Sequence, residues 1–276
     1  ADGRLTAHID AEGNRIEYTH NLDTRQEIVT DRLGYLTVYE YDVVGNVTQT
    51  TDPLGNVRTF TYDARGNKLS ETDPLGNTTT YTYDAQDNLL SKTDPLGNAT
   101  SYTYNSRGQV LTVTDALGRV TTNSYDANGN LLSTVDPLGN ATSHTYDAVG
   151  NRLTTTDGLG YTTSYEYDSA GRMIGQTDAL GHETTYTYDE NGNKLSETTS
   201  RIAAGEPETI TINYVYDAKG RLVETVDPYG YIEGSEYNAL GDRSATVDKL
   251  GRRTEFQYDA AGNLIGTDYA DGTQES

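Results

Sequence analysis

The stretch "DPLGNTTTYTYDAQDNLLSKTDPLGNATSYTYN", residues 73–105, contains the same pattern twice. The run Asp-Pro-Leu-Gly-Asn recurs after 21 residues, and so does a tyrosine followed by Asp or Asn. Self-similarity at a fixed period of 20 to 50 residues is typical of repeat architectures. The fold is therefore expected to be built from one small unit used many times.

The 21-residue spacing extends along nearly the whole chain. Tyr-Asp or Tyr-Asn pairs follow it from Tyr41 to Tyr188 and again from Tyr216 to Tyr258, after one step of 28 residues. We predict a single array over residues 1–276 with about twelve repeats, degenerate within residues 1–40. An insertion at residues 199–210 replaces one Asp-Pro-Leu-Gly turn and is predicted to lengthen one loop by seven residues.

Each unit contains two turn signals separated by strand-like runs. In Asp73-Pro74-Leu75-Gly76 the order of residues suits a type I turn, with Pro second and Gly fourth. Asp63 to Gly66 follows the same order without the proline. The runs between the turns are rich in Thr, Tyr, Val and Leu, which favours strands. Each unit is therefore predicted to be two antiparallel strands.

Residues recur in columns that assign the faces of the sheet. Tyr81 and Tyr83 lie two apart, so they share one face, whereas Thr82 between them faces the other way. We expect one face to carry aromatic and aliphatic ladders and the other to carry hydroxyls. The residues that define the repeat are Tyr62, Asp63, Gly66, Leu69, Asp73, Pro74, Leu75, Gly76, Tyr81, Tyr83 and Asp84.

The predicted fold class is all-β, a repetitive antiparallel meander with two strands per 21-residue repeat. Two identical three-residue loops with a glycine bulge would not give a 21-residue pairing period, so one turn must differ or one strand must carry a bulge. A long open sheet twists and curls, and its apolar face must be covered. We expect a spiral strip or partial shell.

Composition excludes several kinds of partner. The net charge of -22 and the pI near 4.3 argue against binding of nucleic acid or of an anionic membrane surface. The chain has no cysteine and no apolar run long enough for membrane insertion. It begins Ala-Asp-Gly and has a single methionine, Met173, so we expect a processed product or a fragment.

No residue pattern indicates an enzyme or a cofactor site, and we expect neither. Asp52, Asp73 and Asp94 recur along one edge of the sheet, where carboxylates could bind Ca²⁺. Neighbouring carboxylates would be about 10 Å apart, too far to share an ion, so capping of the turns is the favoured interpretation. Tyrosine rows and hydroxyl rows could bind glycans, although both are usual in sheets. The unpaired end strands are expected to support self-association.

The residues from Tyr62 to Leu69 and from Thr72 to Thr79 resemble the Rhs repeat, also called the YD repeat. Its family includes bacterial Rhs polymorphic toxins, wall-associated proteins, the B and C components of Tc toxins and animal teneurins. The resemblance covers about residues 10–272.

The resemblance implies a β-strip that spirals into a hollow shell. In toxins this shell encloses a C-terminal effector, so the implied partners are an effector or flanking shell sequence of the same protein. The implied location is secreted or at the bacterial cell surface, and the alternative is an extracellular adhesion or carbohydrate-binding array without cargo. The family's self-cleavage segment ends Asp-Pro-x-Gly-Leu, whereas each Asp-Pro-Leu-Gly here is followed by Asn, so no self-cleavage is assigned.

Overall fold

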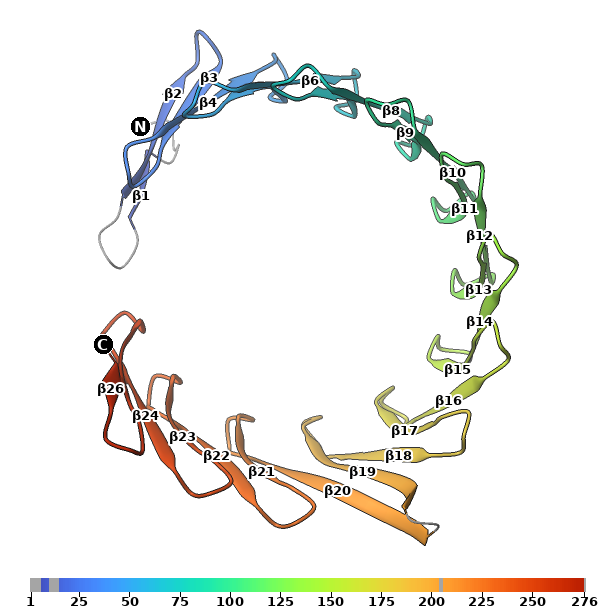
Figure 1. The fold of residues 1–276 in the computed structure, drawn as a ribbon, viewed down its shortest axis with the longest axis vertical. Coiled ribbons are helices and arrows are strands. Elements are labelled where there is room, and N and C mark those ends of the chain that lie inside the picture. Colours follow the sequence, from blue (N-terminus) through green and yellow to red (C-terminus); the bar gives the residue numbers. More distant parts are fainter. Residues whose placement is uncertain (1–5, 10–14, 204–205, 276) are drawn as a thin grey trace. The chain divides into compact units, whose positions relative to one another are not determined.

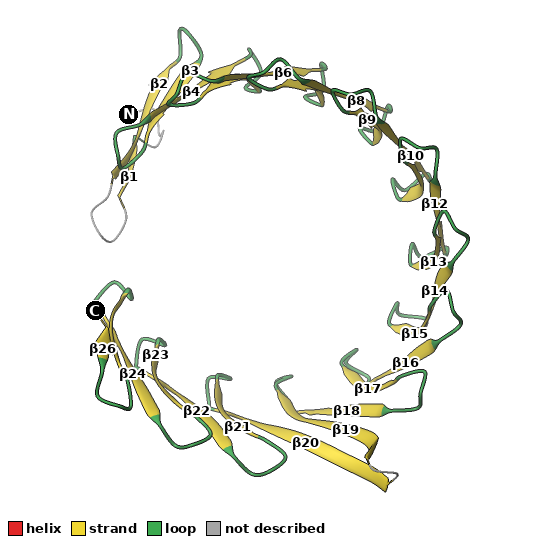
Figure 2. Ribbon diagram, viewed as in Figure 1, coloured by secondary structure: helices red, strands yellow, loops and turns green. Residues whose placement is uncertain are grey.

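The computed structural model describes residues 6–9, 15–203 and 206–275. Within these residues the chain forms 26 β-strands joined by turns, without a helix (Figure 2). None of the described residues forms a helix long and apolar enough to cross a membrane. The all-β prediction is confirmed.

The chain divides into two units, residues 1–140 and 141–276. The strands of the first unit are β1 Ala7–Ile9, β2 Arg15–Asn21, β3 Gln26–Thr30, β4 Leu36–Tyr41, β5 Val47–Thr51, β6 Val57–Tyr62, β7 Lys68–Thr72, β8 Thr78–Tyr83, β9 Leu89–Thr93, β10 Ala99–Tyr104, β11 Val110–Thr114, β12 Val120–Tyr125 and β13 Leu131–Val135. Those of the second are β14 Ala141–Tyr146, β15 Arg152–Thr156, β16 Thr162–Tyr167, β17 Met173–Thr177, β18 Glu183–Tyr188, β19 Lys194–Ala203, β20 Glu206–Tyr216, β21 Leu222–Val226, β22 Ile232–Tyr237, β23 Arg243–Val247, β24 Arg253–Tyr258, β25 Leu264–Asp268 and β26 Gln274–Glu275.

Within each unit every strand pairs antiparallel with the next one along the chain. The first unit runs in this way from β1 to β13. The second unit runs from β14 to β26. Each unit is therefore a meander, and Figure 1 shows that each follows a curve rather than a straight line.

The two turns of a repeat have the same backbone hydrogen bonds. In the turn 73–77 the Gly76 N–H donates to the Asp73 carbonyl and the Asp73 N–H donates to the Asn77 carbonyl. The turn 84–88 repeats both bonds, from Asp87 to Asp84 and from Asp84 to Asn88. Gly76 has φ +85°, the left-handed conformation that glycine adopts without steric cost. The two turns of a repeat therefore do not differ. This leaves the other alternative from the sequence, a bulge in one strand.

A bulge lies in the strand that follows each Tyr-Asp turn. Thr82 pairs with Ser91 but Tyr83 pairs with Leu89, which leaves Leu90 as the extra residue. The same shift of register places an extra residue at Leu69, Leu111, Leu132, Leu153, Ile174, Leu195 and Val223. The aliphatic column seen in the sequence is thus the column of bulged residues.

The bulge sets an offset between successive repeats. Thr80 pairs with Thr93, which pairs with Ala99, nineteen residues beyond Thr80. The repeat equivalent of Thr80 is Ser101, two residues further on. The expectation that pairing must advance by the full period was therefore wrong, because each repeat slides by two residues along its neighbour.

The even offset keeps equivalent residues on one face. A one-residue slip moves every side chain to the opposite face. Without the bulge Leu90 would pair with Thr82, and Thr80 would connect through Lys92 to Thr100. The offset would then be one residue, which is odd, so the faces would alternate from repeat to repeat. Two residues of slide over two strand spacings also tilt the strands by about 35°, close to the tilt in closed barrels.

Two irregular repeats reach the same offset by other means. Between β2 and β3 the register has no shift, but a longer turn with Arg25 at φ 54° compensates, and Thr19 still connects through Ile28 to Val38. At the insertion Thr187 connects through Ser196 to Asn213, again two residues short of its repeat equivalent.

The insertion is a hairpin extension and not a longer loop, so that prediction was wrong. Residues 199–203 of β19 pair with residues 206–210 of β20 in continuous register. The two strands reach 10 and 11 residues in length, and Figure 1 shows them extending beyond the neighbouring turns. The added residues lengthen both strands equally, which leaves the offset unchanged.

The expected buried face is absent from the described residues. Ala245 is the one buried hydrophobic side chain among them, and no polar side chain there is buried. The tyrosines of the repeat, such as Tyr81 and Tyr83, are half-buried. Each unit is a single layer of sheet, so local cross-strand contacts replace the usual core.

Two changes of length separate the length of a repeat from its offset. Replacing residues 199–210 by Asp-Pro-Leu-Gly-Asn removes seven residues and keeps the even offset, so the melting temperature should change by less than about 3 °C. Inserting one alanine between Ser91 and Lys92 makes Thr80 connect through Lys92 to Thr100, which is an odd offset, and should lower the melting temperature by more than about 5 °C. Circular dichroism melts measure both, and an equal effect of the two changes would contradict the offset argument.

Candidate functional site

The strip has two chemically distinct edges. The Tyr-Asp edge consists of the turns that follow the tyrosine pairs, residues 42–46, 63–67, 84–88, 105–109, 126–130, 147–151, 168–172, 189–193, 217–221, 238–242 and 259–263. The Asp-Pro edge consists of the alternate turns, residues 31–35, 52–56, 73–77, 94–98, 115–119, 136–140, 157–161, 178–182, 227–231, 248–252 and 269–273.

The aspartates of both edges cap their own turns. Asp73 Oδ1 accepts hydrogen bonds from the Leu75 and Asn77 N–H groups at 2.9 Å, and Oδ2 accepts one from Asn77 Nδ2 at 2.8 Å. The side-chain bond from Asn77 is the main cause that lowers the pKa of Asp73. The candidate calcium ligands Asp52 and Asp94 make the same three bonds. Among the described residues no three His, Cys, Asp or Glu side chains gather as a metal site.

Neighbouring turns touch at the Tyr-Asp edge. Arg65 donates to the Asp84 and Ala85 carbonyls of the next turn at 2.8 and 2.6 Å, and Gln109 Nε2 donates to the Gly129 carbonyl at 2.7 Å. In the second unit Arg172 reaches the Asp189 carbonyl at 2.8 Å. These bonds link one repeat to the next outside the strand ladder.

The Asp-Pro edge is open by comparison. A Cβ built on Gly76 or Gly97 would meet no atom within 4 Å, whereas one on Gly108 at the other edge would lie 3.1 Å from Asn88. In the second unit Figure 1 shows the Tyr-Asp turns on the inner side of the curve and the Asp-Pro turns on the outer side. Crowding at one edge and spreading at the other are what curvature within a unit requires.

The turn leucines lie at the tips of the Asp-Pro edge and do not join the aromatic face, contrary to the expected ladder. The third turn position lies beyond the last strand pair, so its side chain projects away from the sheet. Their exposure is between 73% and 88% at Leu33, Leu54, Leu75, Leu96, Leu117, Leu138, Leu159, Leu180 and Leu250.

In several repeats the tyrosine of the Tyr-Asp pair bonds to the bulge of the preceding repeat. Tyr104 donates its hydroxyl proton to the Leu89 carbonyl at 2.7 Å, and Leu89 directly precedes the bulged Leu90. Equivalent bonds run from Tyr125, Tyr188, Tyr237 and Tyr258 to Val110, Met173, Leu222 and Arg243. Burial raises the pKa of Tyr104, so its hydroxyl keeps the proton. In these repeats a phenylalanine could not supply the bond.

The other aromatic column has no such requirement. Both phenylalanines of the chain, Phe60 and Phe256, lie in it, two residues before a Tyr-Asp pair. Lysine bridges successive rings of this column at two places. Lys68 Nζ lies 5.7 Å from the Phe60 ring centre and 5.0 Å from that of Tyr81, and its ammonium pairs with Glu71 at 2.7 Å.

The second lysine bridge has the same local sequence. Lys194 lies between Tyr186 and Tyr214, at 5.5 and 4.7 Å, and pairs with Glu197 at 2.7 Å. Residues 66–72 and 192–198 both read Gly-Asn-Lys-Leu-Ser-Glu-Thr. The sequence analysis missed this cluster, although the repeated seven-residue string is a visible signal. Each bridge adds a cation–π contact between repeats.

Hydroxyl side chains of the opposite face pair across strands. The oxygens are 2.6 Å apart in Thr61–Ser70 and Thr82–Ser91 and 2.7 Å apart in Thr103–Thr112, Ser124–Ser133 and Thr145–Thr154. Cross-strand hydroxyl pairs contribute a few tenths of a kcal/mol each, up to about 1 kcal/mol. The hydroxyl rows predicted from the sequence are therefore occupied in holding the sheet together.

The RHS Repeat family profile matches residues 26–57, 41–78, 62–99, 83–120, 125–162, 146–183, 167–207 and 237–274, more than half of the chain. The chain belongs to this family, as its sequence pattern predicted. No curated protein matches the chain.

Solved structures share the fold at low identity. The crystal structures of TcdB2-TccC3 and TcdB2-TccC3-Cdc42 match with TM-score 0.60 and 17% identity over 97% of this chain. The Photorhabdus luminescens Tc holotoxin pore matches with TM-score 0.60 and 16% identity. The chain spans 17–18% of the length of these chains, and at this identity the likeness shows the fold alone.

The tyrosine bond can be tested with a matched pair. Tyr104→Phe removes the bond to the bulge carbonyl and should lower the free energy of unfolding by about 1 kcal/mol. Tyr102→Phe, in the column where phenylalanine occurs naturally, should change it by less than about 0.3 kcal/mol. Urea titration followed by circular dichroism gives both values, and equal losses would contradict the assigned role.

The turn caps predict a stability that falls in acid. The pKa values of the turn aspartates, Asp73 among them, lie below their unfolded value near 4, so their contribution is full above pH 4 and is lost as the pH falls through the folded pKa values. Relief of the -22 charge works in the opposite direction as the pH approaches the pI. We therefore expect the melting temperature to hold between pH 7 and about 5 and to fall below about 4.

A single turn can show the same charge effect. Asn105 already replaces aspartate in one turn and accepts the same two backbone bonds, from Arg107 and Gln109. Asp73→Asn should therefore fold normally at pH 7, whereas Asp73→Ala should lower the melting temperature. Melting curves at pH 7 and pH 3.5 measure this, and identical curves for both variants would contradict the capping role.

Proposed function

We propose that this chain is a structural shell segment of a secreted or cell-surface bacterial toxin and that it is not an enzyme. The observation that carries the proposal is the single-layer sheet with a constant face, in which no described hydrophobic side chain other than Ala245 is buried. A sheet without a core of its own functions as a wall. The family membership and the fold shared with Tc toxin structures support the toxin context.

The function is steric in this proposal. The wall separates an effector of the same protein from its surroundings until delivery, and flanking shell sequence completes the enclosure. Curvature within each unit, produced by crowded Tyr-Asp turns and open Asp-Pro turns, supports a wall that surrounds a space. The charge of -22 favours solubility of so large an exposed sheet.

Small-angle scattering tests the shape of the chain. A curved strip around an empty centre should give a pair-distance distribution with few intermediate vectors relative to a filled particle of the same mass. A straight solid rod would contradict the shell role, because it leaves no room for cargo.

Protease protection tests the containment. In the protein with its native downstream sequence, the downstream segment should resist trypsin while the repeats are intact. The alanine insertion between Ser91 and Lys92 should expose it, and the replacement of residues 199–210 by Asp-Pro-Leu-Gly-Asn serves as the control that should keep protection. Equal cleavage in all three proteins would contradict containment.

A further inference from the structure

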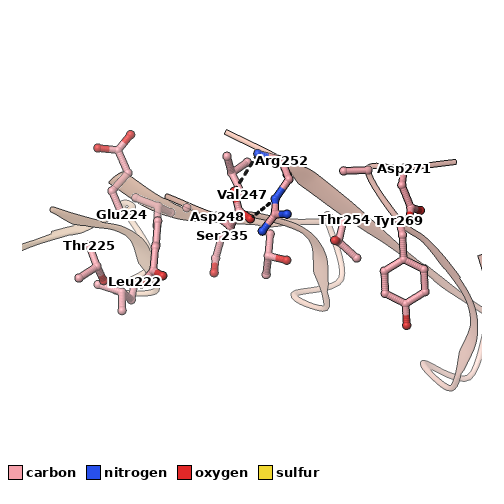
Figure 3. A pocket seen from close by; sticks show the side chains of 15 residues that line it. Leu222, Glu224, Thr225, Ser235, Val247, Asp248, Arg252, Thr254, Tyr269 and Asp271 are labelled. Carbon is pink, nitrogen blue, oxygen red and sulfur yellow. Dashed lines mark hydrogen bonds and ion pairs between the residues drawn. The ribbon is translucent and has the colours of Figure 1, made fainter. Parts of the chain in front are cut away.

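The second unit has a recess of about 550 Å³ over β21 to β24 (Figure 3). Binding sites for small ligands commonly have volumes of about 300–1,000 Å³. In Figure 3 the side chains of Thr225, Ser235, Thr254 and Tyr269 project to one side of the sheet, and Val247 projects to the other. The recess on the first side is therefore bordered by hydroxyl groups and one aromatic ring.

The recess lies where the aromatic column lacks a ring. Ser235 takes the position that Tyr214 occupies one repeat earlier and Phe256 one repeat later. Thr246 lies directly across from Ser235, and Thr254 lies directly across from Thr246. Three hydroxyls on adjacent strands therefore form a row about 4.8 Å apart, the strand spacing.

These hydroxyls are not used by the protein itself. The side chains of Thr225, Ser235, Thr246 and Thr254 are half-buried, and none makes a hydrogen bond to another described residue. The opposite face differs, because its hydroxyls pair with one another as Thr145 and Thr154 do. Half-buried hydroxyls without partners offer both donors and acceptors to a ligand.

Tyr269 provides an aromatic wall beside the row. Its side chain is 38% exposed and its hydroxyl donates to Glu275 at 2.8 Å, which fixes the ring. Carboxylates of Glu233, Asp248 and Asp271 also line the recess. The one cation there, Arg252, is held by Asp248 at 2.6 Å. An aromatic face with hydroxyls and carboxylates matches the C–H face and hydroxyls of a sugar ring, and the carboxylates disfavour an anionic ligand.

We propose that this recess binds one residue of a neutral or amino sugar, stacked on Tyr269 and hydrogen-bonded to the row formed by Ser235, Thr246 and Thr254. The site is independent of the shell role. It is also local, because a tyrosine or phenylalanine in this column fills the space in other repeats, and Asn123, which also lacks a ring, is hydrogen-bonded to the Val110 carbonyl and the Thr134 hydroxyl.

Nuclear magnetic resonance titration of the chain tests the site with three trisaccharide probes. They are maltotriose, the glucosamine trimer and the galacturonic acid trimer, which are neutral, cationic and anionic. Maltotriose or the glucosamine trimer should shift the amide signals of Ser235, Thr246 and Thr254 with millimolar saturation, and the anionic trimer should not. No shifts with any trimer up to about 20 mM, or shifts with the anionic trimer alone, would overturn the proposal.

Variants localise the binding. Ser235→Tyr restores the ring of the repeat and should abolish the shifts, whereas His144→Tyr, which also places a tyrosine in this column but in another repeat, should leave them unchanged. Thr246→Val should weaken binding about five- to tenfold, the loss of one hydrogen bond. Unchanged affinity in Ser235→Tyr, or shifts produced by N-acetyltyrosinamide but by no sugar, would overturn the assignment. Circular dichroism verifies that each variant folds.

Discussion

Antiparallel pairing turns a side chain to the opposite face with each single-residue change of register, so identical repeats can share a face only when their offset is even. Here the bulge at Leu90 and its equivalents makes the offset two residues. The β2–β3 turn and the β19–β20 hairpin reach the same offset by different routes. Three local solutions with one outcome indicate that face continuity, and not turn length, is what this strip preserves.

The bulge also provides a hydrogen-bond acceptor for a tyrosine one repeat later. A carbonyl next to an extra residue falls outside the regular ladder, and the hydroxyl one repeat later, as in Tyr104 to Leu89, supplies its partner. Lysine bridges also act between adjacent repeats, and hydroxyl pairs act between the two strands of one repeat. Stability is then a sum of nearest-neighbour terms, as in other repeat proteins, which lets a wall grow without a core.

The two edges of the strip contribute differently to its curvature. Turns at the Tyr-Asp edge bond to one another, as Arg65 does with the next turn, whereas the Asp-Pro edge presents exposed leucines such as Leu75. A sheet that is crowded at one edge and open at the other curves within each unit. The proposed shell depends on this asymmetry. The proposed sugar recess depends on a local irregularity, the replacement of a ring of the aromatic column by Ser235.

The sequence by itself determined the repeat, the all-β class, the positions of the turns and the faces of the strands, because spacing and turn chemistry act within about 21 residues and need no distant partner. It also placed Leu90 and its equivalents in one column, but their role as bulges needed the register between two strands, which composition does not encode. The extended hairpin at residues 199–210 was mistaken for a loop for the same reason. Exposure of the turn leucines, the lysine bridges and the recess at Ser235 were decided only by the tertiary structure, because each depends on which side chains of adjacent repeats meet once the two-residue offset is fixed.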